Sequence, residues 1–264
     1  MRHLPNLLTL ANLFCGCLAI VYVLNAQPFL YQAADTGMPE VTYSWAYGVQ
    51  QLQMGGILIF FAALFDLLDG FAARALKVFS PIGADLDSLA DLVSFGVAPS
   101  VILYKLLWDC VSREPRITDV DIIYIAPAFL IAVFAALRLA RFNVMPNKGS
   151  SFKGMPVPAV GLLIASFTLI NWDAPTGWTL WLFGSRWALY ALIALLCYLM
   201  VSDIRFMKLM PGKAKLQSLW PQIVLVLVTL IAIPIIHYNA IPLAFVLYIL
   251  LSFVKPKAER ATLV

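Results

Sequence analysis

Four regularly spaced aspartates and an arginine stand out among the charged residues of one short stretch in an apolar chain, FDLLDGFAARALKVFSPIGADLDSLADLVS at residues 65–94. The aspartates are Asp66, Asp69, Asp87 and Asp91, and the arginine is Arg74. A charged side chain inside a membrane segment costs at least about 2.5 kcal/mol. Carboxylates kept beside such apolar runs are therefore expected to perform a function that offsets this cost.

The spacing of these residues predicts two acidic helix faces. At 100° per residue, one helix face carries Asp66, Asp69, Gly70, Ala73 and Arg74. A second face carries Gly83, Asp87, Asp91 and Ser94. The link between the two helices is short and contains a proline, so the helices are expected to be antiparallel neighbours with their acidic ends together.

Carboxylates gathered in this way repel one another unless a cation lies between them. Hard divalent ions such as Mg²⁺, Mn²⁺ and Ca²⁺ prefer oxygen ligands, and the four cysteines show no metal-ligand spacing. A two-metal site would clamp phosphate oxygens and stabilise attacking and leaving oxygens. Gly70 and Gly83 would leave room for a ligand near the backbone, and Arg74 could pair with a phosphate.

Two other interpretations of the aspartates remain. The aspartates could be helix caps and interfacial charges, which suits Asp85 at the start of a helix. Alternatively, they could form the ion pathway of a cation transporter. Against the transporter, no internal repeat is evident and the carboxylates cluster at one membrane face, whereas transport sites lie near the midplane between repeats. Two facing acidic stripes favour a catalytic metal site.

The composition identifies a membrane protein. Of the 264 residues, 62% are apolar and 12% are charged, far from the roughly 45–50% and about 25% of soluble domains. We predict an all-α polytopic bundle that forms a single membrane domain over 1–264, with a catalytic core at about 1–172. Its eight spans are predicted at about 7–25, 52–69, 86–107, 122–142, 156–172, 180–201, 219–237 and 240–254, so additional spans follow the core at about 180–254.

Two of these spans have alternatives. The first could be mistaken for a secretory signal, but its apolar run is too long and contains Asn6, Thr9 and Asn12. The last two could be one long tilted helix broken at its prolines. Because proline removes a backbone donor, a turn at residues 237–239 between two short spans is the preferred interpretation.

The distribution of charge predicts the orientation. Most of the 18 Lys and Arg residues fall in the segments on the same side as the N-terminus. By the positive-inside rule, the N-terminus and the acidic helix ends are expected in the cytoplasm, on a multi-pass protein of the cell membrane. The net charge of +4 thus reflects membrane topology, and no nucleic-acid partner is expected.

The acidic stretch resembles a known family signature. The pattern D-x-x-D-G-x-x-A-R, eight residues, then G-x-x-x-D-x-x-x-D, running from Asp66 to Asp91, is similar to that of the CDP-alcohol phosphotransferase family. The resemblance implies two divalent ions (Mg²⁺ or Mn²⁺, with Ca²⁺ possible) held by the four aspartates. It also implies a CDP-linked donor lying over the segment with Gly70, Ala73, Arg74 and Gly83, and Asp91 as general base toward an acceptor hydroxyl.

Four further stretches resemble the integral-membrane phosphatidylserine synthases. They lie at 4–16, 87–100, 137–143 and 152–159. This resemblance implies transfer of a phosphatidyl group from CDP-diacylglycerol to L-serine among membrane lipids, by a homodimer. The alternative is a transferase of the same family that uses glycerol phosphate, an inositol phosphate or an aminoalcohol as acceptor.

Polar residues in the first and third spans are further candidates. Asn6, Thr9 and Asn12 lie near the cytoplasmic end of the first span, where they could bind the nucleotide. Polar contacts between helices are the alternative role. Ser94 follows the second acidic face and could touch substrate or simply pack.

Cationic residues after the third span are also candidates. Arg138 and Arg141 are three residues apart on one helix face, where they could meet the donor phosphate or the serine carboxylate. Snorkelling to lipid headgroups is the alternative. Lys153, in the loop FKGMPVPA, could contribute to the same site.

Overall fold

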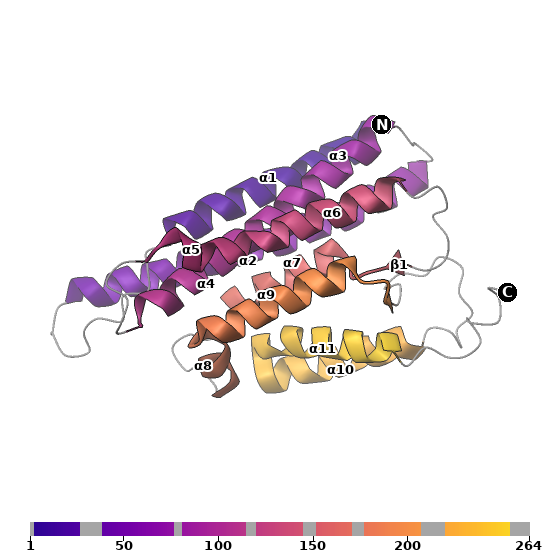
Figure 1. The fold of residues 1–264 in the computed structure, drawn as a ribbon. Helices are drawn as coiled ribbons and strands as arrows, with labels where there is room; N and C mark the ends of the chain where they lie inside the picture. The colour runs from indigo at the N-terminus through magenta and orange to yellow at the C-terminus, as the bar shows by residue number, and fades with distance from the viewer. Residues whose placement is uncertain are drawn as a thin grey trace.

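The fold is known from a computed structural model, and the residues described are 3–26, 39–76, 81–114, 120–144, 152–170, 177–206 and 220–253. It is a bundle of helices, shown in Figure 1. The helices of the first half are α1 (Leu4–Asn25), α2 (Pro39–Leu76), α3 (Pro81–Asp91), the π-helix η1 (Leu92–Val97), α4 (Ala98–Ser112), α5 (Ile122–Ile125), the 3-10 helix η2 (Ala126–Phe129) and α6 (Leu130–Val144). The second half contains α7 (Val157–Thr168), α8 (Gly177–Phe183), α9 (Arg186–Val201), α10 (Trp220–Ile236), the 3-10 helix η4 (His237–Asn239) and α11 (Ala240–Phe253).

The prediction of a polytopic helical bundle is confirmed, since each of the eight predicted segments contains a helix. The number of full-length spans is smaller. Within the described ranges, five helical stretches are long and apolar enough to cross a membrane, and α8 with α9, bent by 85°, would make a sixth. The count differs from eight because α7 has only 12 residues and the last two segments fall in one helical stretch, Ile223–Ser252.

The chain nevertheless turns within that last stretch. Helices α10 and α11 pack against each other, as Figure 1 shows in yellow, and η4 joins them. His237 has a φ of 49°, a left-handed backbone conformation that a chain reversal uses. The predicted turn at residues 237–239 is therefore confirmed.

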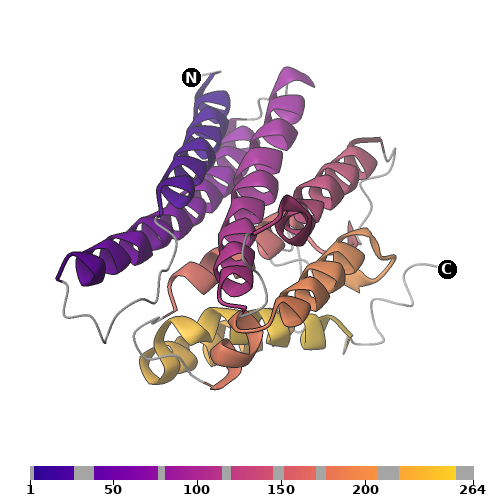
Figure 2. The ribbon, with the colours of Figure 1, turned by 60° about the vertical axis from the view of Figure 1, so that its left-hand side comes forward.

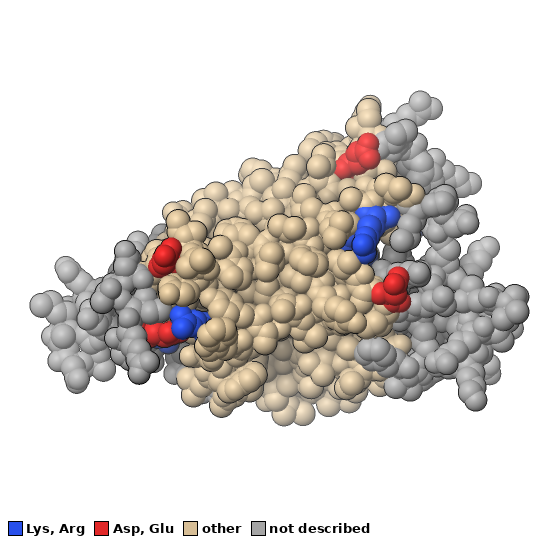
Figure 3. All heavy atoms as spheres, viewed as in Figure 1, with Lys and Arg blue, Asp and Glu red and all other residues tan. Residues whose placement is uncertain are grey.

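Charged side chains lie at the two ends of the bundle. On the face drawn in Figure 3, the described Lys, Arg, Asp and Glu residues appear near both ends, and the band between them is free of them. Many exposed side chains of the long helices are large and apolar, among them Phe14 of α1, Phe61 of α2 and Val133 of α6. A belt of this kind suits contact with lipid tails.

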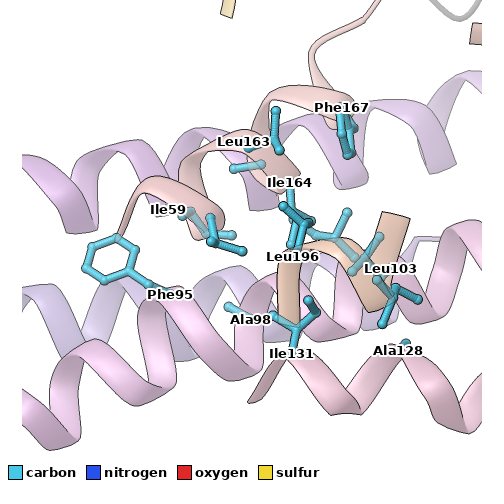
Figure 4. Packing of buried hydrophobic residues seen from close by; sticks show 14 of the residues in the cluster. Ile59, Phe95, Ala98, Leu103, Ala128, Ile131, Leu163, Ile164, Phe167 and Leu196 are labelled. Atoms are coloured by element: carbon cyan, nitrogen blue, oxygen red, sulfur yellow. The ribbon is translucent and has the colours of Figure 1, made fainter. Parts of the chain in front are cut away.

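The core lies where η1, α6, α7 and α9 converge. Each of these elements contributes side chains to one buried cluster, as the close view in Figure 4 shows: Phe95 from η1, Ile131 from α6, Ile164 from α7 and Leu196 from α9. Burying each large apolar side chain contributes about 1.5–3 kcal/mol. This packing buries the centre of η1, and Asp91 directly precedes this helix.

The loop after α6 is tied to the end of α9. A two-stranded antiparallel ladder pairs β1 (Phe152–Lys153) with β2 (Arg205–Phe206). Gly154 follows with a φ of 77°, and its N–H donates to the Ile204 carbonyl at 2.9 Å. A side chain at position 154 would run into the Met200 carbonyl, so glycine is required there. The loop is thereby held at one end of the bundle.

Candidate active site

The site lies at the end of the bundle where α1 begins, α2 ends and α3 begins. Figures 1 and 2 show these three helix ends together from two directions. Oxygen atoms of Asp66, Asp69 and Asp87 all lie within 4.8 Å of one another. The carboxyl group of Asp91 interacts with that of Asp66. The four aspartates predicted from the sequence therefore lie together. They do so because α2 and α3 are antiparallel, so the end of α2 lies beside α3.

This group of carboxylates fits a hard cation. Three of the four can offer one oxygen each to a common ion, and oxygen is the ligand that Mg²⁺, Mn²⁺ and Ca²⁺ prefer. Asp69 is 6% exposed and Asp91 is 8% exposed, and carboxylates so enclosed require a counter-charge or hydrogen-bond donors. The chain can thus hold a divalent metal here.

Helix α1 supplies the donors. The Thr9 hydroxyl donates to Asp69 Oδ2 at 2.7 Å, and Asn12 Nδ2 donates to Asp91 Oδ1 at 3.4 Å. Asn12 is completely buried, and its Oδ1 has no hydrogen-bond partner among the described residues. Polar contacts between helices, one of the two predicted roles, are therefore confirmed for Thr9 and Asn12. Asn6 is half-buried one turn before them, and a nucleotide role for the three residues stays a prediction.

A π-helix follows Asp91 directly, which the sequence analysis did not predict. η1 spans Leu92–Val97, and π-helical turns are rare and frequently found at functional sites. Within it, the Ser94 hydroxyl donates to the Asn12 carbonyl at 3.0 Å, while Phe95 is completely buried in the core. Ser94 therefore holds α1 against η1, and no periodicity in the sequence reveals this turn.

The glycines and Arg74 border the carboxylates. A Cβ added at Gly70 would meet only the Arg74 guanidinium, at 3.5 Å. Arg74 itself is exposed at the end of α2, Ala73 is half-buried beside it, and Gly83 is half-buried near the start of α3. The flexible Arg74 side chain is thus the nearest neighbour of the backbone at Gly70.

The structure separates the two arginines of α6. Arg138 lies close enough for its charge to interact with Asp91, and its guanidinium lies 5.9 Å from the Phe142 ring centroid. Arg141 is exposed and donates to the Val201 carbonyl at 3.5 Å, at the end of α9. Only Arg138 is thus placed beside the carboxylates. The side chain of Lys153 lies outside the described part of the structure.

One further contact at this end was missed by sequence reasoning. Asn143 Nδ2 donates to the Ser88 hydroxyl at 2.9 Å and so links α6 to α3. Both residues fall in stretches that resemble phosphatidylserine synthases, 137–143 and 87–100, which is the signal that could have identified them. The contact holds α6, and with it Arg138, next to the acidic helix.

We expect Gly16→Ala to destabilise the site, because α1 and η1 touch at this glycine. An added Cβ would lie 2.9 Å from Ser94 Cα and closer still to the Ser94 hydroxyl. Overpacking of this kind costs about 1–3 kcal/mol, and it would stretch the hydrogen bond from Asn12 to Asp91. Thermal unfolding in detergent should show the loss. Gly177→Ala is the matched control, since nothing lies within 4 Å of a Cβ there; equal stability of both variants would contradict the close contact.

Comparison with known proteins agrees with this site. Residues 2–198 match the family described as CDP-alcohol phosphatidyltransferase. A CDP-diacylglycerol–serine O-phosphatidyltransferase of Helicobacter pylori is 32% identical over 234 residues, which cover 86% of this chain and 90% of that protein. The enzyme of the same name from Bacillus subtilis is 33% identical over 170 residues, covering 64% and 77%. An archaetidylserine synthase of Methanothermobacter thermautotrophicus is 32% identical over 168 residues, covering 63% and 58%.

Proposed function

The chain belongs to the CDP-alcohol phosphatidyltransferase family, and from this premise we propose that it transfers the phosphatidyl group of CDP-diacylglycerol to L-serine. The products are phosphatidylserine and CMP. The observation that carries the proposal is the group formed by three converging carboxylates, Asp66, Asp69 and Asp87, with Asp91 bonded to Asp66 and donors supplied by α1. The serine acceptor is proposed because the similar bacterial proteins carry that substrate in their names.

The four aspartates would hold two divalent ions, Mg²⁺ or Mn²⁺, with Ca²⁺ a third choice. When bound, such ions polarise phosphate oxygens and stabilise the charge that develops on the attacking and leaving oxygens. Thr9 holds Asp69 in place by its 2.7 Å hydrogen bond. Partners of this type tune metal affinity by orienting the ligands.

In the proposed reaction, Asp91 accepts the proton of the serine hydroxyl. The serine oxygen forms a bond to the diacylglycerol-linked phosphorus, and the bond from that phosphorus to the CMP oxygen breaks. Asn12 donates to Asp91 Oδ1 and so orients the carboxylate that accepts the proton. Trapping a phosphatidyl-enzyme intermediate would overturn this direct transfer.

The remaining residues would bind the substrates. The pyrophosphate of the donor would lie along the surface of Gly70, Ala73 and Gly83, within reach of Arg74, because no bulky side chain covers Gly70. The free acceptor atom Asn12 Oδ1 suits an amino group of the cytosine. Arg138 would bind the acceptor carboxylate or a donor phosphate, and Lys153 and Ser94 are further candidates for substrate binding.

The membrane setting follows from the same proposal. CDP-diacylglycerol would enter laterally from the inner leaflet of the cell membrane, and serine would arrive from the cytoplasm, where the positive-inside rule places the carboxylates. We also propose a homodimer. A cation transporter is the remote alternative, and metal-dependent release of CMP would exclude a pure transporter.

The test is an assay of the purified protein in detergent with CDP-diacylglycerol, Mn²⁺ and radiolabelled acceptors. We expect CMP and labelled phosphatidylserine in equal amounts when serine is supplied. If glycerol phosphate, an inositol phosphate or an aminoalcohol is used and serine is not, the acceptor assignment fails. If no acceptor leads to CMP, the transferase proposal itself fails.

A further inference from the structure

Helix α6 packs on η1 in a defined antiparallel register. At the centre of the contact the two backbones lie close together. A Cβ added at Gly96 of η1 would lie 3.1 Å from Ala135 Cβ and 3.6 Å from Ala132 Cα, both in α6. Small residues on both sides allow this approach. The contact therefore determines which residues of the two helices lie at the same level.

Ser100 joins the two chains one turn beyond Gly96. Its side chain is completely buried. The hydroxyl donates to the Gly96 carbonyl at 2.8 Å and accepts from the Ala132 N–H at 3.1 Å. Ala132 lies in the first turn of α6, where backbone N–H groups need partners from outside the helix. Ser100 thus bonds the start of α6 to the backbone of η1.

A second hydrogen bond joins the chains at the end of the bundle that carries the carboxylates. Asn143 Nδ2 donates to the Ser88 hydroxyl at 2.9 Å, and this hydroxyl donates in turn to the Ala84 carbonyl at 3.2 Å. Ser88 precedes Gly96 by eight residues, and Asn143 follows Ala135 by eight residues. The bond therefore obeys the same register as the central contact.

Arg138 lies on α6 between these two hydrogen bonds. It follows Ala135 by three residues and so shares the helix face that touches η1. Because the two chains are antiparallel, this position is level with the chain about three residues before Gly96, where α3 ends at Asp91 and η1 begins. The register thus places the half-buried Arg138 beside the last of the four aspartates.

We propose that the two hydrogen bonds on either side of Arg138 fix the register of α6, and that Ser100 and Asn143 are therefore positioning residues. At this register Arg138 stays level with Asp91, where its guanidinium binds an anionic oxygen group of a substrate. A shift of α6 by one helical turn would move the guanidinium by about 5.4 Å, which is longer than any hydrogen bond. The bound group is a carboxylate of the acceptor or a phosphate of the donor. This inference rests on the proposed transferase function.

The test compares steady-state kinetics of CMP release for the wild type and Asn143→Ala. Asn143 is exposed and alanine is the better helix former, so the variant keeps the helix and loses the bond to Ser88. We expect KM for one substrate to rise about five-fold, as for one lost hydrogen bond, while kcat changes less than about two-fold. A rise in KM for serine identifies the carboxylate as the bound group, and a rise in KM for CDP-diacylglycerol identifies the phosphate.

Variants of Ser88 distinguish positioning from a direct contact between Asn143 and a substrate. Ser88→Ala removes the acceptor of the bond and should raise the same KM by a similar factor. Ser88→Thr keeps the hydroxyl and should give wild-type values. Ser100→Ala, on the other side of Arg138, should also raise this KM. An effect of Asn143→Ala that Ser88→Ala does not share would overturn the positioning role.

Tyr190→Phe is the matched control. It also removes a side-chain hydrogen bond between two helices, from the Tyr190 hydroxyl to the Tyr124 carbonyl at 2.6 Å. This bond joins α9 to α5 at the other end of the bundle (Figure 1). Both kinetic constants should stay at wild-type values. A change of KM in the control equal to that in Asn143→Ala would show that lost stability alone explains the effect.

A double-mutant cycle with Arg138→Met separates positioning from general support of the fold. If Asn143 acts through Arg138, removing its amide has no further effect on KM once the guanidinium is gone. Unchanged KM values in active Asn143→Ala enzyme, or additive effects in the cycle, would overturn the positioning role and leave the transferase function standing. A wild-type protein that releases no CMP with any acceptor would overturn both.

Discussion

Replacing Asp91 with asparagine is expected to reduce kcat for CMP release by about 10²–10⁴-fold, the contribution of a well-placed general base. The variant keeps the size of the side chain, and its amide oxygen can still accept the hydrogen bond from Asn12 Nδ2. What it loses is the capacity to take up the proton of the acceptor hydroxyl, together with one of the four negative charges that would hold the metal ions. The measurement is the rate of CMP release at saturating CDP-diacylglycerol and serine.

The control for this change is Asp85→Asn. Asp85 lies on the same helix as Asp87 and Asp91 but is exposed near its start, and the substitution alters the net charge identically. Its rate should stay within about two-fold of the wild type, as expected for surface substitutions away from a site. Retention of more than about a tenth of the wild-type kcat by Asp91→Asn would show that another group takes the proton.

Removing divalent metal is expected to abolish the reaction. A chelator added to the purified protein should stop CMP release completely, and added Mn²⁺ or Mg²⁺ should restore it. The physical reason is that oxygens of Asp66, Asp69 and Asp87 converge within 4.8 Å, an arrangement of like charges that a cation stabilises. The measurement is the CMP rate as a function of free metal concentration.

Substitution of a single carboxylate sharpens this prediction. Asp69→Asn removes one charged ligand and should raise the Mn²⁺ concentration for half-maximal activity by at least about ten-fold, given that loss of even a ligand's supporting partner costs 10–100-fold in affinity. Asp121→Asn is the control, because Asp121 caps α5, where its carboxylate accepts from the Ile123 N–H, and asparagine caps equally well. Full activity in the presence of excess chelator would contradict the metal site.

Most of the acidic site could be predicted because it depends on local geometry. Asp66 and Asp69, three residues apart, share a helix face in any α-helix, and so does the pair Asp87 and Asp91 four residues apart. The short link requires the two helices to lie side by side. The apolar composition likewise indicates membrane helices without reference to any contact. For these features, no knowledge of packing was needed.

The number of spans was harder to predict because hydropathy does not record where a helix bends or stops. The predicted span 156–172 contains a 12-residue helix, and the segment 180–201 is divided by an 85° bend between α8 and α9. Both segments are predominantly apolar. An apolar side chain is shielded from water equally well in a long helix, a short helix or a bent pair of helices. Hydropathy therefore does not distinguish these arrangements.

By itself, the sequence determined the acidic group of the candidate site: four aspartates on two neighbouring helix faces, with Gly70 beside them. Only the tertiary structure decided which other residues join them. Asn12 donates to Asp91 because α1 approaches η1 at Gly16. Arg141, which shares a helix face with Arg138 in the sequence, bonds instead to the Val201 carbonyl at the end of α9. Spacing along one helix follows from its fixed geometry, whereas contacts between helices depend on how whole side-chain surfaces fit together.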